Sequence, residues 1–260
     1  MSAIVTIREL LDAGVHFGHK TSRWNPKMGP YIVKQKNRIH IINLKETVRA
    51  LFQARHFLRE MAAQGKTILF VGTKRQATVI VEKEARRCGM PFINNRWLGG
   101  FLTNRDVVLA RIDKYHEMTA LESTKEFQVY SKKQIARHNT EKERIHKNLA
   151  GVMELTTVPD MLLVVGLWDE RIAVTEARSC KVPIVAIADT DSDPRQVDCA
   201  IPANDESFRA ITVIMGKLTD AIVEGRQRLN IAKDTSAVSF GPEKDAAKAV
   251  VPAADEPKKV

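Results

Sequence analysis

Four runs of consecutive apolar residues, separated by longer amphipathic segments, constrain the fold of this chain most strongly. They cover residues 67–73 (TILFVGT), 91–94 (PFIN), 161–167 (MLLVVGL) and 182–189 (VPIVAIAD), and a weaker run lies near 199–201. Because the runs are continuous rather than alternating, they are typical of parallel strands that are buried on both faces. The sequence therefore predicts an open parallel sheet.

Helical patterns lie between these runs. Asn43 is expected to cap a helix that ends before Gly65. Asn204 or Asp205 is expected to cap a later one. Further helices are predicted over 75–88, 169–180 and 205–225. Strand–helix alternation with right-handed crossovers indicates a doubly wound α/β fold.

Residues 104–155 interrupt this alternation, because they contain no strand-like run and exceed an ordinary crossover. They are predicted to form two long helices around a polar turn near 123–128. Their apolar residues form a thin seam, which suits an antiparallel helical hairpin that projects from the domain. A dimerising coiled coil is the alternative, but the repeat is short and irregular, so we do not expect an obligate homo-oligomer. The seam consists of Val107, Val108, Ile112, Tyr115, Met118 and Leu121 in the first helix and Ile135, Ile145, Leu149, Val152 and Met153 in the second.

The domain organisation follows from these patterns. We expect a discontinuous α/β domain over 1–103 and 156–231, with the hairpin over 104–155 inserted into it. The domain begins with a Gly-, Pro- and Lys/Arg-rich extension, in which residues 31–42 are predicted to form a β-hairpin. The segment 232–260 is rich in Ala, Lys, Pro and Glu and is predicted to be a disordered tail.

The charge is distributed unevenly along the chain. The sequence has 41 Lys+Arg against 31 Asp+Glu, for a net charge of +10. Residues 1–100 alone carry +12, whereas residues 151–200 carry −5. A surface made soluble by charge mixes the two signs, so this segregation favours a face that binds a polyanion, most often nucleic acid. A solvated basic face is the simpler alternative.

Three basic clusters with aromatic or amide neighbours supply contact chemistry for RNA. Lys and Arg neutralise phosphates, and Arg and Trp stack on unpaired bases. Core packing is the alternative for each of the two tryptophans in these clusters. The predicted RNA-binding residues are Lys20, Arg23, Trp24, Asn25, Lys27, Lys74, Arg75, Asn95, Arg96, Trp97, Asn104 and Arg105.

Enzymatic motifs are missing from the sequence. Gly65-Lys66-Thr67 precedes its strand instead of following one, and Glu60 stands where a phosphate-binding loop needs glycine. The chain has no G-x-G-x-x-G fingerprint, no G-x-S-x-G elbow and no H-E-x-x-H. We therefore expect no enzyme. A nucleotide-dependent α/β enzyme is the main alternative, since the fold often carries one, and a coiled-coil adaptor that binds only proteins is another.

The sequence constrains the cellular location of the protein and the pairing of its cysteines more loosely. No run approaches the ~18 apolar residues of a membrane span, and MSAIVTIREL does not resemble an export signal. The three cysteines, Cys88, Cys180 and Cys199, form no C-x-x-C, so a disulfide framework or thiolate zinc site is not expected. We expect a cytoplasmic protein.

Six ordered blocks carry a resemblance to a known family. They are GVHFGHKTSRWNPKM, NRIHIINLKET, ILFVGTKRQA, NNRWLGGFLTN, PDMLLVV and IADTDSDPRQVDCAIPANDESFRAI. Over residues 7–225 the chain resembles the bacterial second small-subunit ribosomal protein family. The resemblance implies a flavodoxin-like domain with an inserted coiled-coil hairpin and a ribosome-bound, structural role on small-subunit ribosomal RNA. It also implies contacts with other small-subunit proteins, including docking of the messenger-binding first protein. The chain departs from the typical pattern at 167–170 and in the second hairpin helix.

Acidic residues also point to a metal. Asp189 ends one predicted strand, and Asp205 with Glu206 follows the next, so their carboxylates are expected to meet at the carboxyl edge of the sheet. If the N-terminal loop folds over this edge, His16 and His19 reach it, and an imidazole favours zinc over magnesium. The alternatives are a helix cap at Asp205 and a loop hydrogen bond at His19. The resemblance also implies a zinc pocket, matched at His19, Asp189 and Asp205, with Glu206 in place of a more usual Asp.

Overall fold

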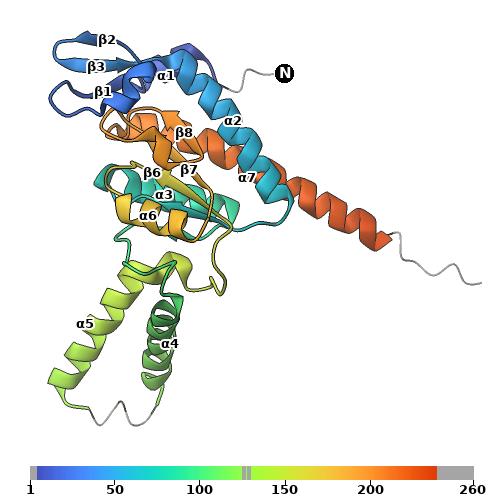
Figure 1. Cartoon of the computed structure of the whole chain (residues 1–260). Coiled ribbons are helices and arrows are strands. Elements are labelled where there is room, and N and C mark those ends of the chain that lie inside the picture. The colour runs from blue at the N-terminus through green and yellow to red at the C-terminus, as the bar shows by residue number, and fades with distance from the viewer. Residues whose placement is uncertain (1–4, 125–126, 128–129, 239–260) are drawn as a thin grey trace, which may run out of the picture.

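Strand residues alternate between two hydrophobic cores on the two faces of a parallel sheet. In β4 (Ile68–Val71), Ile68 and Phe70 belong to one core and Leu69 and Val71 to the other, and all four are fully buried. The computed structural model describes residues 5–124, 127 and 130–238, with backbone only over 232–238 (Figure 1). The other strands of this sheet are β5 (Phe92–Ile93), β6 (Met161–Val165), β7 (Ile184–Ala188) and β8 (Cys199–Pro202).

The sheet has the order β5-β4-β6-β7-β8, and each neighbouring pair is parallel. This is the flavodoxin-like order, in which the strand sequence reverses between β4 and β6. The predicted fold class is therefore confirmed.

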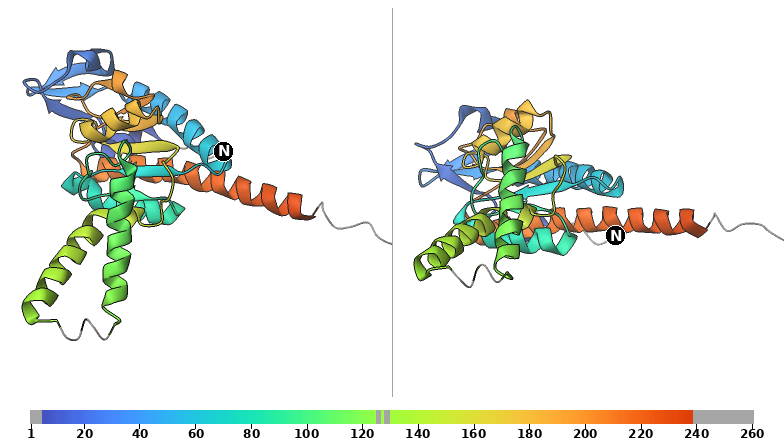
Figure 2. Two further views of the ribbon diagram at one scale, coloured as in Figure 1. Left: turned by 60° about the horizontal axis from the view of Figure 1, so that its bottom comes forward. Right: turned by 90° about the horizontal axis from the view of Figure 1, so that it is seen from below.

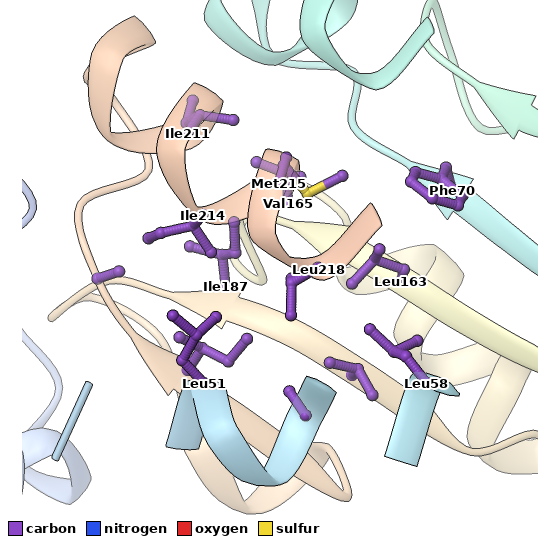
Figure 3. Packing of buried hydrophobic residues seen from close by; sticks show 14 of the residues in the cluster. Leu51, Leu58, Phe70, Leu163, Val165, Ile187, Ile211, Ile214, Met215 and Leu218 are labelled. Carbon is purple, nitrogen blue, oxygen red and sulfur yellow. The ribbon is translucent and has the colours of Figure 1, made fainter. Parts of the chain in front are cut away.

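Helices cover both faces of the sheet. The first core lies under α2 (Leu44–Ala63), α3 (Arg75–Cys88) and α7 (Phe208–Val238), and Figure 3 shows α2 and α7 side chains meeting those of the strands. The second core lies under α6 (Arg171–Ser179) and the base of the hairpin. Burial of apolar side chains on both faces explains why the strand sequences are apolar throughout.

Local signals set both ends of α2 as predicted. The Asn43 side chain accepts a hydrogen bond from the Lys45 N–H at the start of α2, and Gly65 follows its end with a φ of +75°. The start of α7 differs. Neither predicted residue is the N-cap: the Ser207 hydroxyl accepts from the Ala210 N–H at the start of the helix, Asn204 Oδ1 accepts from the N–H groups of Glu206 and Ser207 in the preceding turn, and Asp205 is buried. The helix begins at Phe208 and continues to Val238, past the predicted end at 225.

A small antiparallel sheet of order β1-β3-β2 lies beside the main domain. It consists of β1 (Phe17–Lys20), β2 (Ile32–Lys36) and β3 (Ile39–Ile42), and it is preceded by α1 (Ile7–Asp12). The predicted hairpin is β2–β3, whose turn residues Asn37 and Arg38 both have positive φ. The sequence patterns did not predict α1 and β1. Short 3-10 helices occur at Pro26–Tyr31 (η1), Ala150–Val152 (η3) and Pro194–Gln196 (η4).

The inserted segment forms the predicted helical hairpin, which projects from the domain (Figure 2). Its helices are α4 (Arg105–Leu121) and α5 (Lys132–Leu149), and Ser131 and Gln134 form a capping box at the start of α5. The seam is thin, as expected, although Val107 is 47% exposed rather than part of it. The base of the hairpin is not independent, because Val108, Ile112 and Leu149 belong to the second core. The domain limits at 104 and 155 stay a prediction.

The predicted tail lies mostly outside the described residues. Helix α7 extends through 232–238, which belonged to the tail expected over 232–260. Residues 239–260 are not among those described. Their predicted disorder therefore stays a prediction.

Candidate nucleic-acid interface and metal site

The N-terminal loop after β1 presents the first group of predicted RNA-binding residues. Lys20 and Arg23 are exposed and form no ion pair within the described part of the chain. Trp24 is 40% exposed, and its ring lies 4.9 Å from that of His40. Asn25 and Lys27 make contacts within the protein. Asn25 caps η1, and Lys27 Nζ lies 2.5 Å from Asp193 Oδ2.

Lys74 and Arg75, adjacent in sequence, have different environments at the start of α3. Arg75 is exposed. The Lys74 side chain is only 13% exposed, and its Nζ lies 2.7 Å from Asp205 Oδ1 and 3.0 Å from Asp169 Oδ2. Burial by itself lowers the pKa of Lys74, but the two carboxylates raise it overall, so the cation stays charged and is neutralised within the protein.

The loop before the hairpin contains a buried tryptophan. Trp97 is 6% exposed, packs against Phe101 at 5.0 Å and donates its Nε1–H to Glu176. The Glu176 carboxylate also accepts from the N–H groups of Gly100 and Leu102. Core packing, the alternative for this residue, is therefore confirmed for Trp97, and one buried carboxylate organises the loop.

The remaining residues of this cluster lie at the base of the hairpin. Asn95 and Arg96 are exposed, and the Asn95 amide donates to Asn148 Oδ1 on α5. Asn104 is also exposed. The Arg105 guanidinium donates to the carbonyl oxygen of Leu155 and ties the two ends of the insertion together.

A cationic cavity lies between this loop and the hairpin. It has a volume of about 520 Å³, and its charged lining residues are Arg96, Arg144 and Lys147, with no carboxylate among them. Sequence reasoning missed Arg144 and Lys147, which are three residues apart and therefore share one face of α5. That spacing was the available signal, but it gained meaning only when α5 was placed against residues 95–99.

An acidic pocket lies at the carboxyl edge of the sheet, where the small sheet meets β7. The His19 N–H donates to Thr190 Oγ1 at 2.8 Å, and this bond brings the imidazole over the edge. A side chain at position 18 would clash, because a Cβ on Gly18 would lie 2.5 Å from Thr190 Cγ2. His19, Asp189 and Asp205, all buried, each offer a ligand atom, and these atoms lie within 4.8 Å of one another. His16, the other candidate histidine, is not part of this group.

The imidazole of His19 lies among three carboxylates. His19 Nδ1 lies 3.1 Å from Asp189 Oδ2, and Nε2 lies 3.1 Å from Glu206 Oε1 and 3.6 Å from Asp191 Oδ2. The hydrogen bond with Asp189 raises the pKa of His19 to about 9, against the opposing effect of burial. Burial raises the pKa of Asp205 to about 7, although Lys74 opposes the rise.

The donor set of the pocket fits zinc. One imidazole with two or more carboxylates is a ligand set that zinc accepts, and Asp205 Oδ2 accepts no hydrogen bond from the described residues. The same pocket holds a cation of its own, because Lys74 lies against Asp205. A metal would therefore compete with Lys74 for this carboxylate and with a proton for His19.

Polar side chains of this chain meet at the switch point between β4 and β6, where doubly wound proteins commonly bind ligands. Glu170 is buried, and its carboxylate accepts the Thr73 N–H at 2.6 Å. Gly166, with a φ of +83°, allows close approach, since a Cβ there would lie 2.9 Å from Asp205 Oδ2 and 3.1 Å from Lys74 Cε. Two carboxylates and a lysine thus lie at the switch point of the sheet.

These features define a flavodoxin-like α/β protein with cationic residues exposed on a loop and at the base of a projecting helical hairpin. The comparison with protein families agrees. Residues 10–225 match the family model of Ribosomal protein S2, and the chain belongs to this family. It is a structural protein of the small ribosomal subunit, acts in translation and is not an enzyme. None of the helices in the described residues is long and apolar enough to cross a membrane.

Proposed function

We propose that the chain binds small-subunit ribosomal RNA through two cationic surfaces and remains in the cytoplasm as part of the ribosome. The N-terminal surface consists of Lys20, Arg23 and Trp24, and the hairpin-base surface consists of Arg96, Arg144 and Lys147. The observation that carries the proposal is the hairpin-base cavity, where three cations line one hollow without a carboxylate. Like charges gathered in this way repel one another, and phosphates relieve the repulsion.

Several predicted RNA-binding residues are left out of these surfaces because the protein uses them itself. Lys74 pairs with Asp205, Lys27 pairs with Asp193, and Trp97 is buried. Asn25 and Arg105 make hydrogen bonds that hold η1 and the base of the hairpin. Arg75, Asn95 and Asn104 are exposed and extend the proposed surfaces.

The salt dependence of RNA binding tests the proposal. If Arg96 and Arg144 neutralise phosphates, replacing both with Ala flattens the slope of log affinity against log salt by about one to two units. A matched control replaces Lys45 and Arg49, two exposed cations on α2, and leaves the slope unchanged. Equal slopes for the wild type and the Arg96/Arg144 variant would show that this cavity does not bind RNA.

We also propose that an apolar patch docks the messenger-binding first protein of the small subunit. We assign to this surface four exposed apolar side chains from α1, β1 and the start of α7, namely Ile7, Leu11, Phe17 and Phe208, which are 46–54% exposed. Hydrogen bonds from Asn204 to Val15 and from Ser207 to Ala13 hold its two halves together. An exposed apolar patch suits a protein chain better than RNA. Co-purification of the first protein with a Phe17→Ala/Phe208→Ala variant is expected to fall. A Val79→Ala control, which removes an apolar side chain 64% exposed on α3, retains it.

A structural zinc ion is the third part of the proposal. His19, Asp189 and Asp205 come from β1, the end of β7 and the segment before α7. An ion held by them would cross-link the small sheet to the main domain. The pocket supports this because it collects an imidazole and buried carboxylates around one point.

A further inference from the structure

A second cavity lies between the N-terminal loop and the segment after β6. It has a volume of about 350 Å³ and is lined by residues 22–26, Trp168 and Asp191. Trp168 is 48% exposed and Trp24 is 40% exposed, so each keeps much of its ring surface accessible. We call this hollow the tryptophan cavity.

The charge around the tryptophan cavity is positive at its rim. Arg23 lines it, and the Arg171 guanidinium lies 5.8 Å from the centre of a Trp168 ring. Within the described ranges, neither arginine forms an ion pair with a carboxylate. Asp191 does not balance them at the surface, because its side chain is 5% exposed and directed to Ser192 and His19.

Backbone hydrogen bonds hold the segments that carry the two tryptophans. The Asn25 N–H donates to the Thr190 carbonyl at 2.8 Å, which fixes the chain next to Trp24 to the end of β7. On the other side, the Glu170 N–H donates to the carbonyl of Gly166, closing the turn that carries Trp168. The cavity is therefore formed before any ligand arrives, which lowers the entropic cost of binding.

We propose that the tryptophan cavity holds one unpaired nucleobase of RNA, an inference that rests on the proposed RNA-binding function. Aromatic rings and guanidinium planes are the usual surfaces on which unpaired bases stack, while neighbouring cations hold the flanking phosphates. The volume lies near the lower limit of small-ligand sites, which suits one base and excludes a duplex. Aromatic cages also bind cationic side chains of proteins, but Arg23 and Arg171 would repel such a side chain here.

Tryptophan fluorescence reports directly on a nucleobase bound in the cavity, because the two cavity tryptophans are exposed and Trp97 is buried. A Trp24→Phe variant of the full chain leaves Trp168 as the exposed indole. It is titrated at low salt with a five-unit ribose-phosphate oligomer that carries one central adenine, and separately with a fully abasic oligomer of equal charge. We expect the adenine oligomer to quench Trp168 and to bind about ten-fold more tightly than the abasic one.

Two further variants show whether the cavity is responsible. In otherwise wild-type protein, Trp168→Ala is expected to abolish the preference for the adenine oligomer. Phe52→Ala, which removes an aromatic ring 47% exposed on α2, retains it. Since Trp168 is half exposed, its loss leaves both hydrophobic cores intact.

The outcomes separate this inference from the proposed function. Equal binding of both oligomers without quenching overturns the nucleobase site, while their binding still supports RNA contact through phosphates. If the protein binds neither of the oligomers and also fails to bind small-subunit ribosomal RNA, both proposals are wrong. If Trp168→Ala weakens co-sedimentation with small subunits but keeps the preference for adenine, the cavity takes a protein chain and the nucleobase proposal is wrong.

Discussion

Lys74 Nζ lies 2.7 Å from Asp205 Oδ1 in the crevice that open α/β sheets usually reserve for a ligand. Asp205 has no exposed surface, and the Lys74 side chain is 13% exposed. The pair closes the crevice on the side of α3, and Glu170 closes it beside Thr73. The protein thus has a fold that many nucleotide enzymes share, with an internal ion pair and a buried carboxylate at its switch point.

Removal of Lys74 should destabilise the fold rather than weaken RNA binding. In Lys74→Met, the Asp205 carboxylate stays buried without its cation, so we expect the free energy of unfolding at pH 8 to fall by about 3 kcal/mol. Urea unfolding measures this, and Arg75→Met, at the exposed neighbouring position, changes it by less than ~0.5 kcal/mol. If the Lys74→Met variant has wild-type stability and a flatter slope of log RNA affinity against log salt, then Lys74 binds RNA instead.

The stability of the metal-free protein should decrease as the pH rises. Asp205 has a pKa of about 7 when folded and an ordinary value of 3.8, and His19 has about 9 against 6.5. Both bind protons more tightly in the folded state, so their stabilising contributions are complete below the ordinary values and lost as the pH passes 7 and 9. The decrease between pH 6.5 and 9 should be roughly 2–3 kcal/mol from His19.

Urea unfolding in a chelating buffer at several pH values follows this decrease. His19→Asn removes the upper part of the pH dependence, and Asp205→Asn removes the lower part. If stability rises with pH between 6.5 and 9 in the metal-free wild type, then His19 is not held as an imidazolium by its carboxylate neighbours.

Zinc should bind in the acidic pocket and displace the His19 proton. Elemental analysis of the purified wild type is expected to find about one zinc per chain, and His19→Ala plus Asp205→Ala is expected to lose it. Asp193→Ala, outside the ligand set, retains the metal. Because the ligand must be deprotonated, zinc affinity rises between pH 6 and 9. Wild-type protein without zinc, or equal zinc in the double variant, would contradict the site.

Glu176 should be one of the most sensitive polar positions. Its carboxylate accepts three hydrogen bonds, from Trp97 Nε1 and from the backbone of Gly100 and Leu102. Glu176→Ala leaves these buried donors without an acceptor, and we expect a loss of about 3 kcal/mol in the free energy of unfolding. Glu176→Gln keeps one acceptor oxygen, so its free energy of unfolding should fall by less.

Chemical unfolding followed by far-ultraviolet circular dichroism provides the measurement. Glu154→Ala, at an exposed carboxylate, is the control and stays near wild type. A near-neutral Glu176→Ala variant would show that water replaces the carboxylate and that the loop does not depend on it.

The sequence was sufficient where a structure depends on neighbours along the chain. Apolar runs such as 161–165 predicted the strands, because a strand covered on both faces has to be apolar throughout. Asn43 and Gly65 predicted the ends of α2, because caps act within one turn. Most of the seam of the hairpin was predicted for the same reason, whereas the polar turn expected near 123–128 lies partly outside the described residues and stays a prediction. The short helix α1 and the four-residue strand β1 are too brief to leave such a pattern.

The tertiary structure decided what each charged or aromatic residue does. Lys74 and Arg75 are equivalent by sequence, yet only Lys74 meets Asp205. Trp24 and Trp97 lie in similar basic segments, yet Glu176 draws Trp97 into the core and Trp24 stays at the surface. Propensities and caps act over a few residues, whereas the crossovers of the sheet bring together groups far apart in sequence. The sequence by itself therefore determined the elements and the kind of chemistry, and packing determined which side chains are free to bind.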